Sequence, residues 1–232
     1  MRKWGIVVSI FYALIVLGLI VPGAVFIAGA DFGAHALRDT YGAWGVRIVF
    51  LVVLSCQVLL LFLSVDTSHK RLKPRTHILV SSAATAVLTA LLTSAVIWSL
   101  GVAIRGDKFF DLLDNFAKRF FGDNDTYLGI FWTSIFWVTP WLLWTILFYF
   151  YYRNSSAVVN RLISWLLKGS VLELLIAVPC HIIIRRRHDC SAPAATSFGI
   201  ATGIAIMLLS FGPSVLFLYK KRLDAYPPRT SA

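Results

Sequence analysis

The sequence predicts an all-α integral membrane protein, a bundle of six transmembrane helices with one short interfacial amphipathic helix, forming a single domain over residues 1–232. Hydrophobic residues make up 58% of the chain, charged residues only 14%, and the mean hydropathy is +0.77. Soluble domains have roughly 45–50% apolar and 25% charged residues. The chain also contains long apolar runs of the roughly 20 residues that cross a bilayer core. These runs leave no room for a soluble domain.

The positive charge of the chain is typical of membrane anchoring. The net charge is +11 and the pI is near 9.9. Lys and Arg stand mostly at the ends of the apolar runs, where they contact lipid head groups, and they form no basic face with interleaved aromatic residues. We therefore expect membrane lipids as partners and no nucleic acid. The three cysteines are too few for a disulfide framework, although Cys180 and Cys190 can form a single disulfide if they face an oxidising compartment.

The first two spans are predicted over residues 4–28 and 46–65. Basic residues precede the first run, and small residues near its end resemble a signal cleavage site, but the run is longer than a typical signal core. We therefore expect an uncleaved helix. The second run contains Gln57, whose side-chain amide needs a partner inside the bundle.

The third span, residues 77–104, carries a stripe of small and hydroxyl residues. Ser81, Thr85, Thr89 and Thr93 recur at intervals of four, so they share one face of a helix. This pattern favours close helix packing over a polar conduit. The next segment, 107–121, separates phenylalanines from charged residues on opposite faces, which predicts an amphipathic helix in the membrane interface.

The fourth span, residues 127–152, is rich in aromatic residues. Trp137, Trp141 and Trp144 recur at helical spacing, which favours a packed or lipid-facing stripe over a site for a flat cofactor or quinone.

The sixth span, residues 196–219, contains Gly199 and Gly203 four positions apart. This spacing of small residues predicts close contact with a neighbouring helix. We expect the tail 223–232 to be disordered.

The distribution of basic residues predicts that both termini are cytoplasmic. This orientation places the cluster from Lys70 to Arg75 and the run from Lys220 to Arg222 inside. The run from Arg185 to Arg187 then lies outside, although basic residues tend to lie on the cytoplasmic side. An alternative keeps these arginines inside by making residues 162–184 a re-entrant or interfacial hairpin, but it moves Lys220 to Arg222 outside.

The fifth span, residues 162–184, carries the candidate functional site. Its centre holds Glu173, the only glutamate in the chain. Helical periodicity places Ser170, Glu173, Cys180 and His181 on one face, and Pro179 predicts a bend. An ionised carboxylate inside a membrane is costly, so intramembrane acids mark functional sites by default. We predict an ion or proton site formed by these four residues; the structural alternative is a neutral Glu173 hydrogen-bonded to the hydroxyl stripe of the third span.

Two further sites are candidates at the end of this span. Cys180, His181, His188 and Cys190 are ligand types for zinc or copper, but the chain must fold back after Arg187 for all four to meet. Without that turn they are unrelated thiols and imidazoles or a disulfide. Arg185, Arg186 and Arg187 can hold a lipid phosphate, or simply anchor the helix end.

Taken together, these features favour a small transporter or channel-like protein with a proton or cation site at Glu173. Two alternatives come from other classes. The first is a membrane-embedded enzyme acting on a lipid or isoprenoid phosphate, although the sequence contains no phosphate loop, dinucleotide turn or hydrolase motif. The second is a structural subunit of a larger complex. We expect the chain to act as a homo-oligomer or within a membrane complex.

Overall fold

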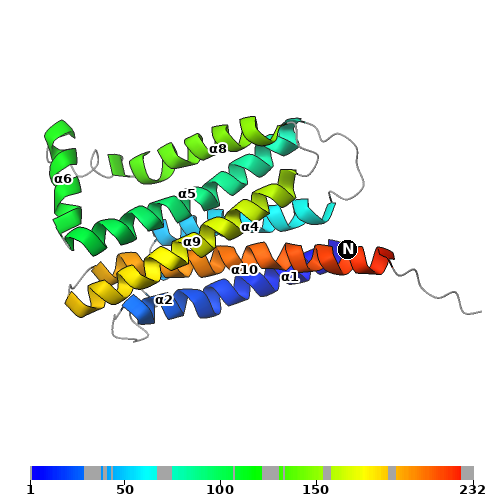
Figure 1. Cartoon of the computed structure of the whole chain (residues 1–232), viewed down its shortest axis with the longest axis horizontal. Helices are drawn as coiled ribbons and strands as arrows, with labels where there is room; N and C mark the ends of the chain where they lie inside the picture. Colours follow the sequence, from blue (N-terminus) through cyan, green and yellow to red (C-terminus); the bar gives the residue numbers. More distant parts are fainter. Residues whose placement is uncertain are drawn as a thin grey trace, which may run out of the picture.

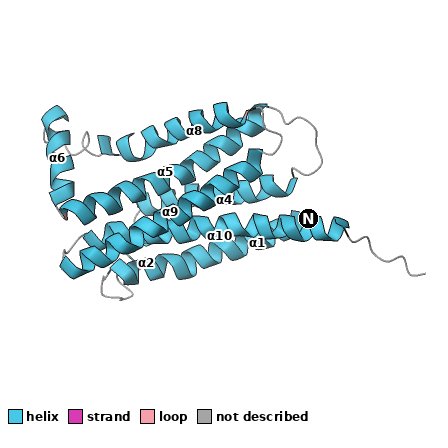
Figure 2. Ribbon diagram, in the orientation of Figure 1, coloured by secondary structure: helices cyan, strands magenta, loops and turns pink. Residues whose placement is uncertain are grey.

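The computed structural model describes residues 2–28, 38, 41–42, 44–66, 75–106, 108–121, 131–132, 134–153, 158–187 and 192–225. Within these ranges the regular elements are all helices, most of which run along one long axis (Figures 1 and 2). The prediction of an all-helical chain is thereby confirmed. The elements are α1 (Arg2–Ile15), η1 (Val16–Ile20), α2 (Val21–Ala28), α4 (Trp44–Asp66), α5 (Arg75–Arg105), α6 (Lys108–Phe121), η2 (Ser134–Val138), α8 (Thr139–Tyr152), α9 (Val158–Arg187) and α10 (Ala192–Ala225).

Five helical stretches among the described residues are long and apolar enough to cross a membrane, which identifies a multi-pass membrane protein. They are Ile6–Ala28, Ile78–Arg105, Ser134–Tyr152, Val158–Arg187 and Pro193–Phe211. The predicted second span falls on α4, whose described apolar stretch, Arg47–Leu60, is shorter. In Figure 1 the start of α1 and the end of α10 lie at the same end of the bundle.

Several predicted boundaries shift. The helix predicted over 162–184 extends over Val158–Arg187, and α10 continues to Ala225, into the predicted tail. Residues 226–232, like much of the segment 122–133 at the start of the predicted fourth span, lie outside the described residues. The helices extend beyond the predicted spans because the polar and basic residues that flank each apolar run also favour a helix. Hydropathy marks only the apolar part of each helix and not its ends.

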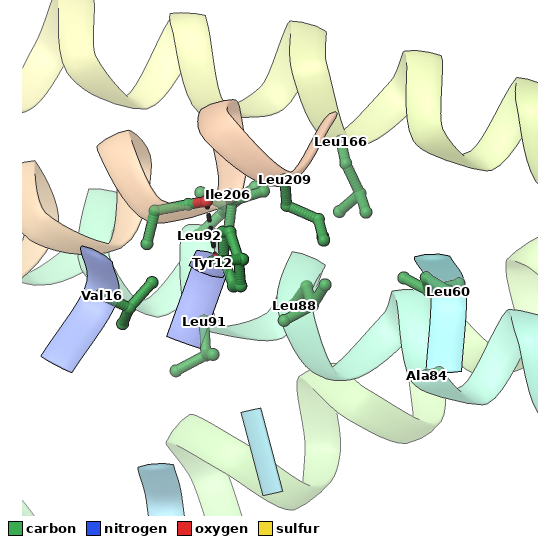
Figure 3. Packing of buried hydrophobic residues seen from close by; sticks show 11 residues of the cluster. Tyr12, Val16, Leu60, Ala84, Leu88, Leu91, Leu92, Leu166, Ile206 and Leu209 are labelled. Atoms are coloured by element: carbon green, nitrogen blue, oxygen red, sulfur yellow. Dashed lines mark hydrogen bonds between the residues drawn. The ribbon is translucent and has the colours of Figure 1, made fainter. Parts of the chain in front are cut away.

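The largest apolar core among the described residues joins six elements: α1, η1, α4, α5, α9 and α10 (Figure 3). Tyr12 of α1 is buried there and donates a hydrogen bond from its hydroxyl to the backbone oxygen of Ala205 in α10 at 2.9 Å. This bond satisfies the one polar group of an otherwise apolar cluster, which ties the first helix to the last. The cluster comprises Tyr12, Val16, Leu60, Ala84, Leu88, Leu91, Leu92, Leu166, Ala205, Ile206 and Leu209.

The hydroxyl stripe of α5 is a packing surface. Thr85, Thr89 and Thr93 each donate to the backbone oxygen four residues earlier, at 2.8 to 3.0 Å. The indole nitrogen of Trp144 in α8 donates to the Thr93 hydroxyl at 3.1 Å, and that of Trp141 donates to the Ala83 carbonyl at 3.2 Å. The structure therefore supports the packing interpretation of both the threonine stripe and the tryptophan stripe.

Both π-helical turns use a carbonyl oxygen as an acceptor for another part of the chain. The wider turn disturbs the usual backbone ladder and makes a carbonyl available. In η2, the oxygen of Phe136 accepts a bond from the Ser94 hydroxyl of α5 at 2.6 Å. In η1, the oxygen of Leu17 accepts a bond from the Tyr41 hydroxyl. Each irregular turn is thus fixed by a side chain from elsewhere.

The amphipathic segment forms helix α6, which lies across the end of α5 instead of along it (Figure 1). Gly106 makes the change of direction with a positive φ of 63°, a conformation that glycine adopts without steric strain. The Phe109 ring then packs on Gly101: a β-carbon at Gly101 would lie 2.4 Å from it. On the outer side, Lys118 and Asp114 form an ion pair at 3.1 Å.

Candidate functional site

The structure places Glu173 in the interior of the bundle. It lies at the centre of the 30-residue helix α9, and none of its surface is exposed. Ser170, Ala177 and Cys180 are buried with it, so the polar face predicted from the sequence is the inward face of α9. At about 1.5 Å per residue, Glu173 is about 20 Å from either end of the helix. The carboxyl group is therefore remote from both ends of the helix.

The partner of Glu173 is Thr202 of α10. The Thr202 hydroxyl lies 2.9 Å from Oε1 of Glu173, and also 3.0 Å from the backbone oxygens of both Phe198 and Gly199. A hydroxyl carries a single proton. Thr202 therefore cannot donate a full hydrogen bond to the carboxyl group and to its own helix at the same time.

The second carboxyl oxygen of Glu173, Oε2, is buried and has no hydrogen-bond partner within the described part of the chain. The predicted structural alternative, a bond from Glu173 to the hydroxyl stripe of the third span, is wrong. Thr85, Thr89 and Thr93 donate to their own helix instead. An unpaired buried oxygen costs about 1–3 kcal/mol when the group is neutral and more when it is charged.

Sequence reasoning missed Thr202, although a signal was present. Thr202 directly precedes Gly203 in the segment GIATG, whose two glycines predict the close helix contact. A hydroxyl residue beside a small-residue contact face is brought close to whatever polar group the neighbouring helix presents. The segment alone does not show that α9 is the helix that packs against Thr202.

Small residues bring α5, α9 and α10 close together next to this pair. A β-carbon at Gly199 would lie 3.0 Å from the Ser99 hydroxyl of α5, 3.3 Å from the β-carbon of Ala177 of α9 and 3.7 Å from that of Ala95. These distances are those of side chains in direct contact. Side chains of α5 and α9 therefore both pack against the backbone of Gly199. The Ser99 hydroxyl is itself buried without a partner among the described residues. The prediction of a close helix contact at these glycines agrees with this geometry.

The other residues of the predicted ion site do not converge on Glu173. The Ser170 hydroxyl donates to the Leu167 carbonyl of its own helix at 2.9 Å. Cys180 is a free thiol in a separate apolar cluster with Val102, Ile184 and Ala195. Cys180 and His181 are about two turns, or about 10 to 12 Å, further along α9. The structure thus reduces the four-residue site to Glu173 and its partner on α10.

His181 makes a contact of its own. Its Nδ1 lies 2.8 Å from the hydroxyl oxygen of Thr196, which in turn donates to the carbonyl of Pro193 at 3.2 Å. Both bonds are satisfied when His181 carries its proton on Nδ1 and donates it to Thr196. This chain of bonds connects the ends of α9 and α10.

The predicted zinc or copper site is not supported by the part of the chain that the structure describes. No group of three or more His, Cys, Asp or Glu side chains that could hold a metal ion occurs there. Cys180 and His181 are adjacent on a helix, so their side chains diverge. The other two predicted ligands, His188 and Cys190, lie outside the described residues.

Two of the three arginines at the end of α9 bind backbone oxygens at the ends of other helices. Arg185 Nη2 donates to the Ile27 oxygen of α2, and Arg187 Nη1 donates to the Ala103 oxygen of α5, both at 2.7 Å. Arg186 is exposed. The last carbonyls of a helix have no intrahelical donor and carry the negative end of the helix dipole, so a cation stabilises them. These contacts give Arg185 and Arg187 a structural role at the ends of α2 and α5.

The described residues therefore contain one buried acid with a single hydroxyl partner, and two helix ends capped by arginine. Both features are built from contacts between different helices, and neither corresponds to a catalytic motif in the sequence. No protein-family model, curated protein or solved structure matches this chain.

Proposed function

We propose that this chain is a small multi-pass transport protein in which Glu173 binds and releases a proton. The observation that carries the proposal is the environment of that carboxyl group: it is fully buried at the middle of a membrane-spanning helix, with one oxygen bonded to Thr202 and the other without a partner among the described residues. Buried acids of this kind are rare in membranes and mark ion or proton pathways. The group is neutral when protonated and costly when charged.

The hydroxyl of Thr202 gives a physical reason for binding a proton at this position. When Glu173 is protonated, its O–H can donate to the Thr202 oxygen while Thr202 donates to the Phe198 carbonyl 3.0 Å away. The acid proton and the Thr202 hydroxyl proton then each have an acceptor. When the proton leaves, Thr202 must either turn its proton toward the carboxylate or leave the charge without a donor. The proton on Glu173 therefore decides which partner Thr202 binds.

A proton suits this site better than a metal cation. Calcium takes six to eight oxygen ligands and magnesium needs six in octahedral geometry. Oε2 of Glu173 instead faces the backbone of Gly203, where a β-carbon would lie 3.3 Å from it. The same β-carbon would lie 2.9 Å from Cγ of Leu174, so aliphatic atoms crowd this point as well.

Transport also requires that the carboxylate reach water once it is charged, and the contact between α9 and α10 is suited to movement. Gly199 and Gly203 present bare backbone to α9, and Pro179 interrupts the backbone ladder of α9 between Glu173 and the arginines. In this proposal, deprotonation favours a shift of α10 along α9 that admits water to Glu173, and protonation favours the closed packing.

The proposed topology has six spans, with α4 as the additional one and both termini on the same side. α4 extends over 23 residues, about 34 Å at helical rise, which is enough to cross a hydrocarbon core of about 30 Å. The common position of the start of α1 and the end of α10 in Figure 1 supports an even number of crossings. The basic cluster from Lys70 to Arg75 favours the cytoplasm for that end.

In the same proposal α6 lies in the membrane interface. It runs across the bundle end, exposes the apolar side chains of Leu112 and Phe116, and carries the Asp114–Lys118 ion pair. A helix with one apolar face and one charged face is stable at the boundary between head groups and acyl chains.

Proton flux into liposomes tests the function. The purified chain is reconstituted in potassium-loaded vesicles with a pH-sensitive dye, and a valinomycin-induced potential drives protons. We expect wild-type vesicles to change internal pH faster than protein-free vesicles, and Glu173→Gln to fall to the protein-free rate because the amide cannot exchange a proton with the pathway. Asp114→Asn, which removes an exposed acid in α6, is the matched control and should keep the wild-type rate.

Two outcomes contradict the proposal. Flux through a folded Glu173→Gln variant equal to that of wild type shows that the carboxyl group carries no proton. Wild-type flux indistinguishable from protein-free vesicles rejects proton transport by the isolated chain and moves the structural-subunit alternative ahead. Folding of each variant is checked by its elution on gel filtration and by thermal unfolding in detergent.

A further inference from the structure

A groove between the first helix and α4 has no role in the proton site. Its volume is about 480 Å³, within the range of roughly 300–1,000 Å³ typical of small-molecule sites. Its wall is formed mainly by aliphatic and aromatic side chains: Leu17, Phe50, Leu51, Leu54 and Val58, with Ser55 as the small polar exception. Such a wall accommodates a hydrocarbon chain.

One end of the groove is polar and positively charged. Arg47 lines it, and its Nε donates to the backbone oxygen of Tyr41 at 2.6 Å. The guanidinium carbon lies 5.8 Å from the centre of the Trp44 ring, a cation–π distance. These contacts fix the guanidinium group and leave the N–H donors on its two terminal nitrogens for a ligand.

Among the described residues that line this groove, none is acidic. The Tyr41 hydroxyl donates to the Leu17 oxygen of η1. Burial raises the pKa of Tyr41, so this hydroxyl remains neutral. Within this described lining no side chain compensates the charge of Arg47, which therefore complements an anion.

The length of the groove matches one leaflet of a bilayer. Arg47 lies one turn inside the start of α4, and Val58 is eleven positions later. At a helical rise of about 1.5 Å these residues are about 16 Å apart. Half of a hydrocarbon core of about 30 Å is about 15 Å. A lipid whose phosphate contacts Arg47 can therefore lay one acyl chain along the whole groove.

We propose that the groove between η1 and α4 binds one anionic phospholipid, with its phosphate on Arg47 and an acyl chain along Phe50, Leu54 and Val58. Arginine binds phosphate through two parallel N–H donors, which fixes orientation as well as supplying charge. A bound acyl chain adds contacts between η1 and α4, beside the hydrogen bond from the Tyr41 hydroxyl to Leu17. This site is independent of Glu173 and of proton transport.

Native mass spectrometry of the detergent-solubilised full chain tests the site. Phosphatidylglycerol and phosphatidylcholine with identical acyl chains are titrated separately, and the retained lipid is counted. A single basic residue near a membrane surface favours anionic lipid by about 5-fold. We expect wild type to retain one phosphatidylglycerol about 5-fold more strongly than phosphatidylcholine, and Arg47→Gln to lose this preference. Arg105→Gln, which removes an exposed arginine at the end of α5, is the matched control and should keep it.

A second variant tests the acyl-chain part of the site. Ser55 is exposed and lines the groove, so Ser55→Phe fills the groove without disturbing the core. We expect it to weaken the retention of both lipids by a similar factor and to leave Arg47 in place. Unchanged lipid retention in Ser55→Phe overturns the proposal. Wild-type preference for phosphatidylglycerol in Arg47→Gln, or an equal loss in Arg105→Gln, overturns it as well.

Discussion

Gly203 of α10 faces Oε2 of Glu173, the carboxyl oxygen that has no hydrogen-bond partner among the described residues. A β-carbon at position 203 would lie 3.3 Å from that oxygen, 2.9 Å from Cγ of Leu174 and 3.0 Å from its Cδ2. Real side chains essentially never approach as closely as the shortest of these contacts. The missing side chain of Gly203 is therefore what lets α10 approach the carboxyl group closely enough for the neighbouring Thr202 to bind it.

Substituting this glycine should loosen the site. We expect Gly203→Ala to destabilise the fold by about 1–3 kcal/mol, the usual effect of overpacking a closely packed interface. Gly23→Ala is the matched control, because a β-carbon at Gly23 of α2 meets nothing within 4 Å. Alanine is the better helix former, so this control should be neutral or slightly stabilising. Thermal unfolding in detergent measures both; equal stability of the two variants contradicts the close contact.

A double-mutant cycle measures the bond between Thr202 and Glu173. Thr202→Val keeps the shape of the side chain and removes the hydroxyl, which leaves both carboxyl oxygens without a hydrogen-bond partner among the described residues. We expect a loss of about 1–3 kcal/mol in the wild-type background. With Glu173→Leu already present there is no carboxyl group to satisfy, so the same change should cost much less. Equal effects of Thr202→Val in the two backgrounds would mean that the hydroxyl serves only its own helix.

Infrared spectroscopy can observe the proton on Glu173 directly, because the chain contains no other glutamate. We expect a carboxylic acid C=O band at neutral pH that shifts when the protein is labelled with ¹³C-glutamate, since no cation among the described residues bonds the buried group and stabilises its charged form. Glu173→Gln should abolish the labelled band. A labelled carboxylate signal in its place at neutral pH contradicts the proposed resting state, and the ten aspartates cannot interfere because they remain unlabelled.

Loss of an arginine that caps a helix end should lower the free energy of unfolding more than loss of the exposed Arg186. Arg187→Gln removes the bond to the Ala103 oxygen and a cation from the end of α5. We expect a loss of about 0.3–1 kcal/mol, because the side chain is largely exposed and solvent screens its charge. Arg186→Gln, at an exposed position on the same helix end, should change stability less. Thermal unfolding at low and high salt measures both variants, and the Arg187 effect should shrink at high salt.

The sequence by itself determined which residues enter the interior. Composition and run length predict a membrane protein, because only apolar helices are stable in hydrocarbon. The period of 3.6 residues predicts the inward face of α9, with Ser170, Glu173 and Cys180 on one side, and the small residues Gly199 and Gly203 predict a close contact. Each of these inferences uses positions within one helix, where spacing alone fixes geometry.

Only the tertiary structure decided which groups meet. Glu173 binds Thr202 of α10 instead of the hydroxyls of α5, Cys180 and His181 lie too far along α9 to join it, and Arg187 reaches the end of α5. The physical reason is that partners across helices depend on the rotation and axial offset of each helix against its neighbours. Those quantities result from packing summed over many side chains distant in sequence, and no local spacing encodes them.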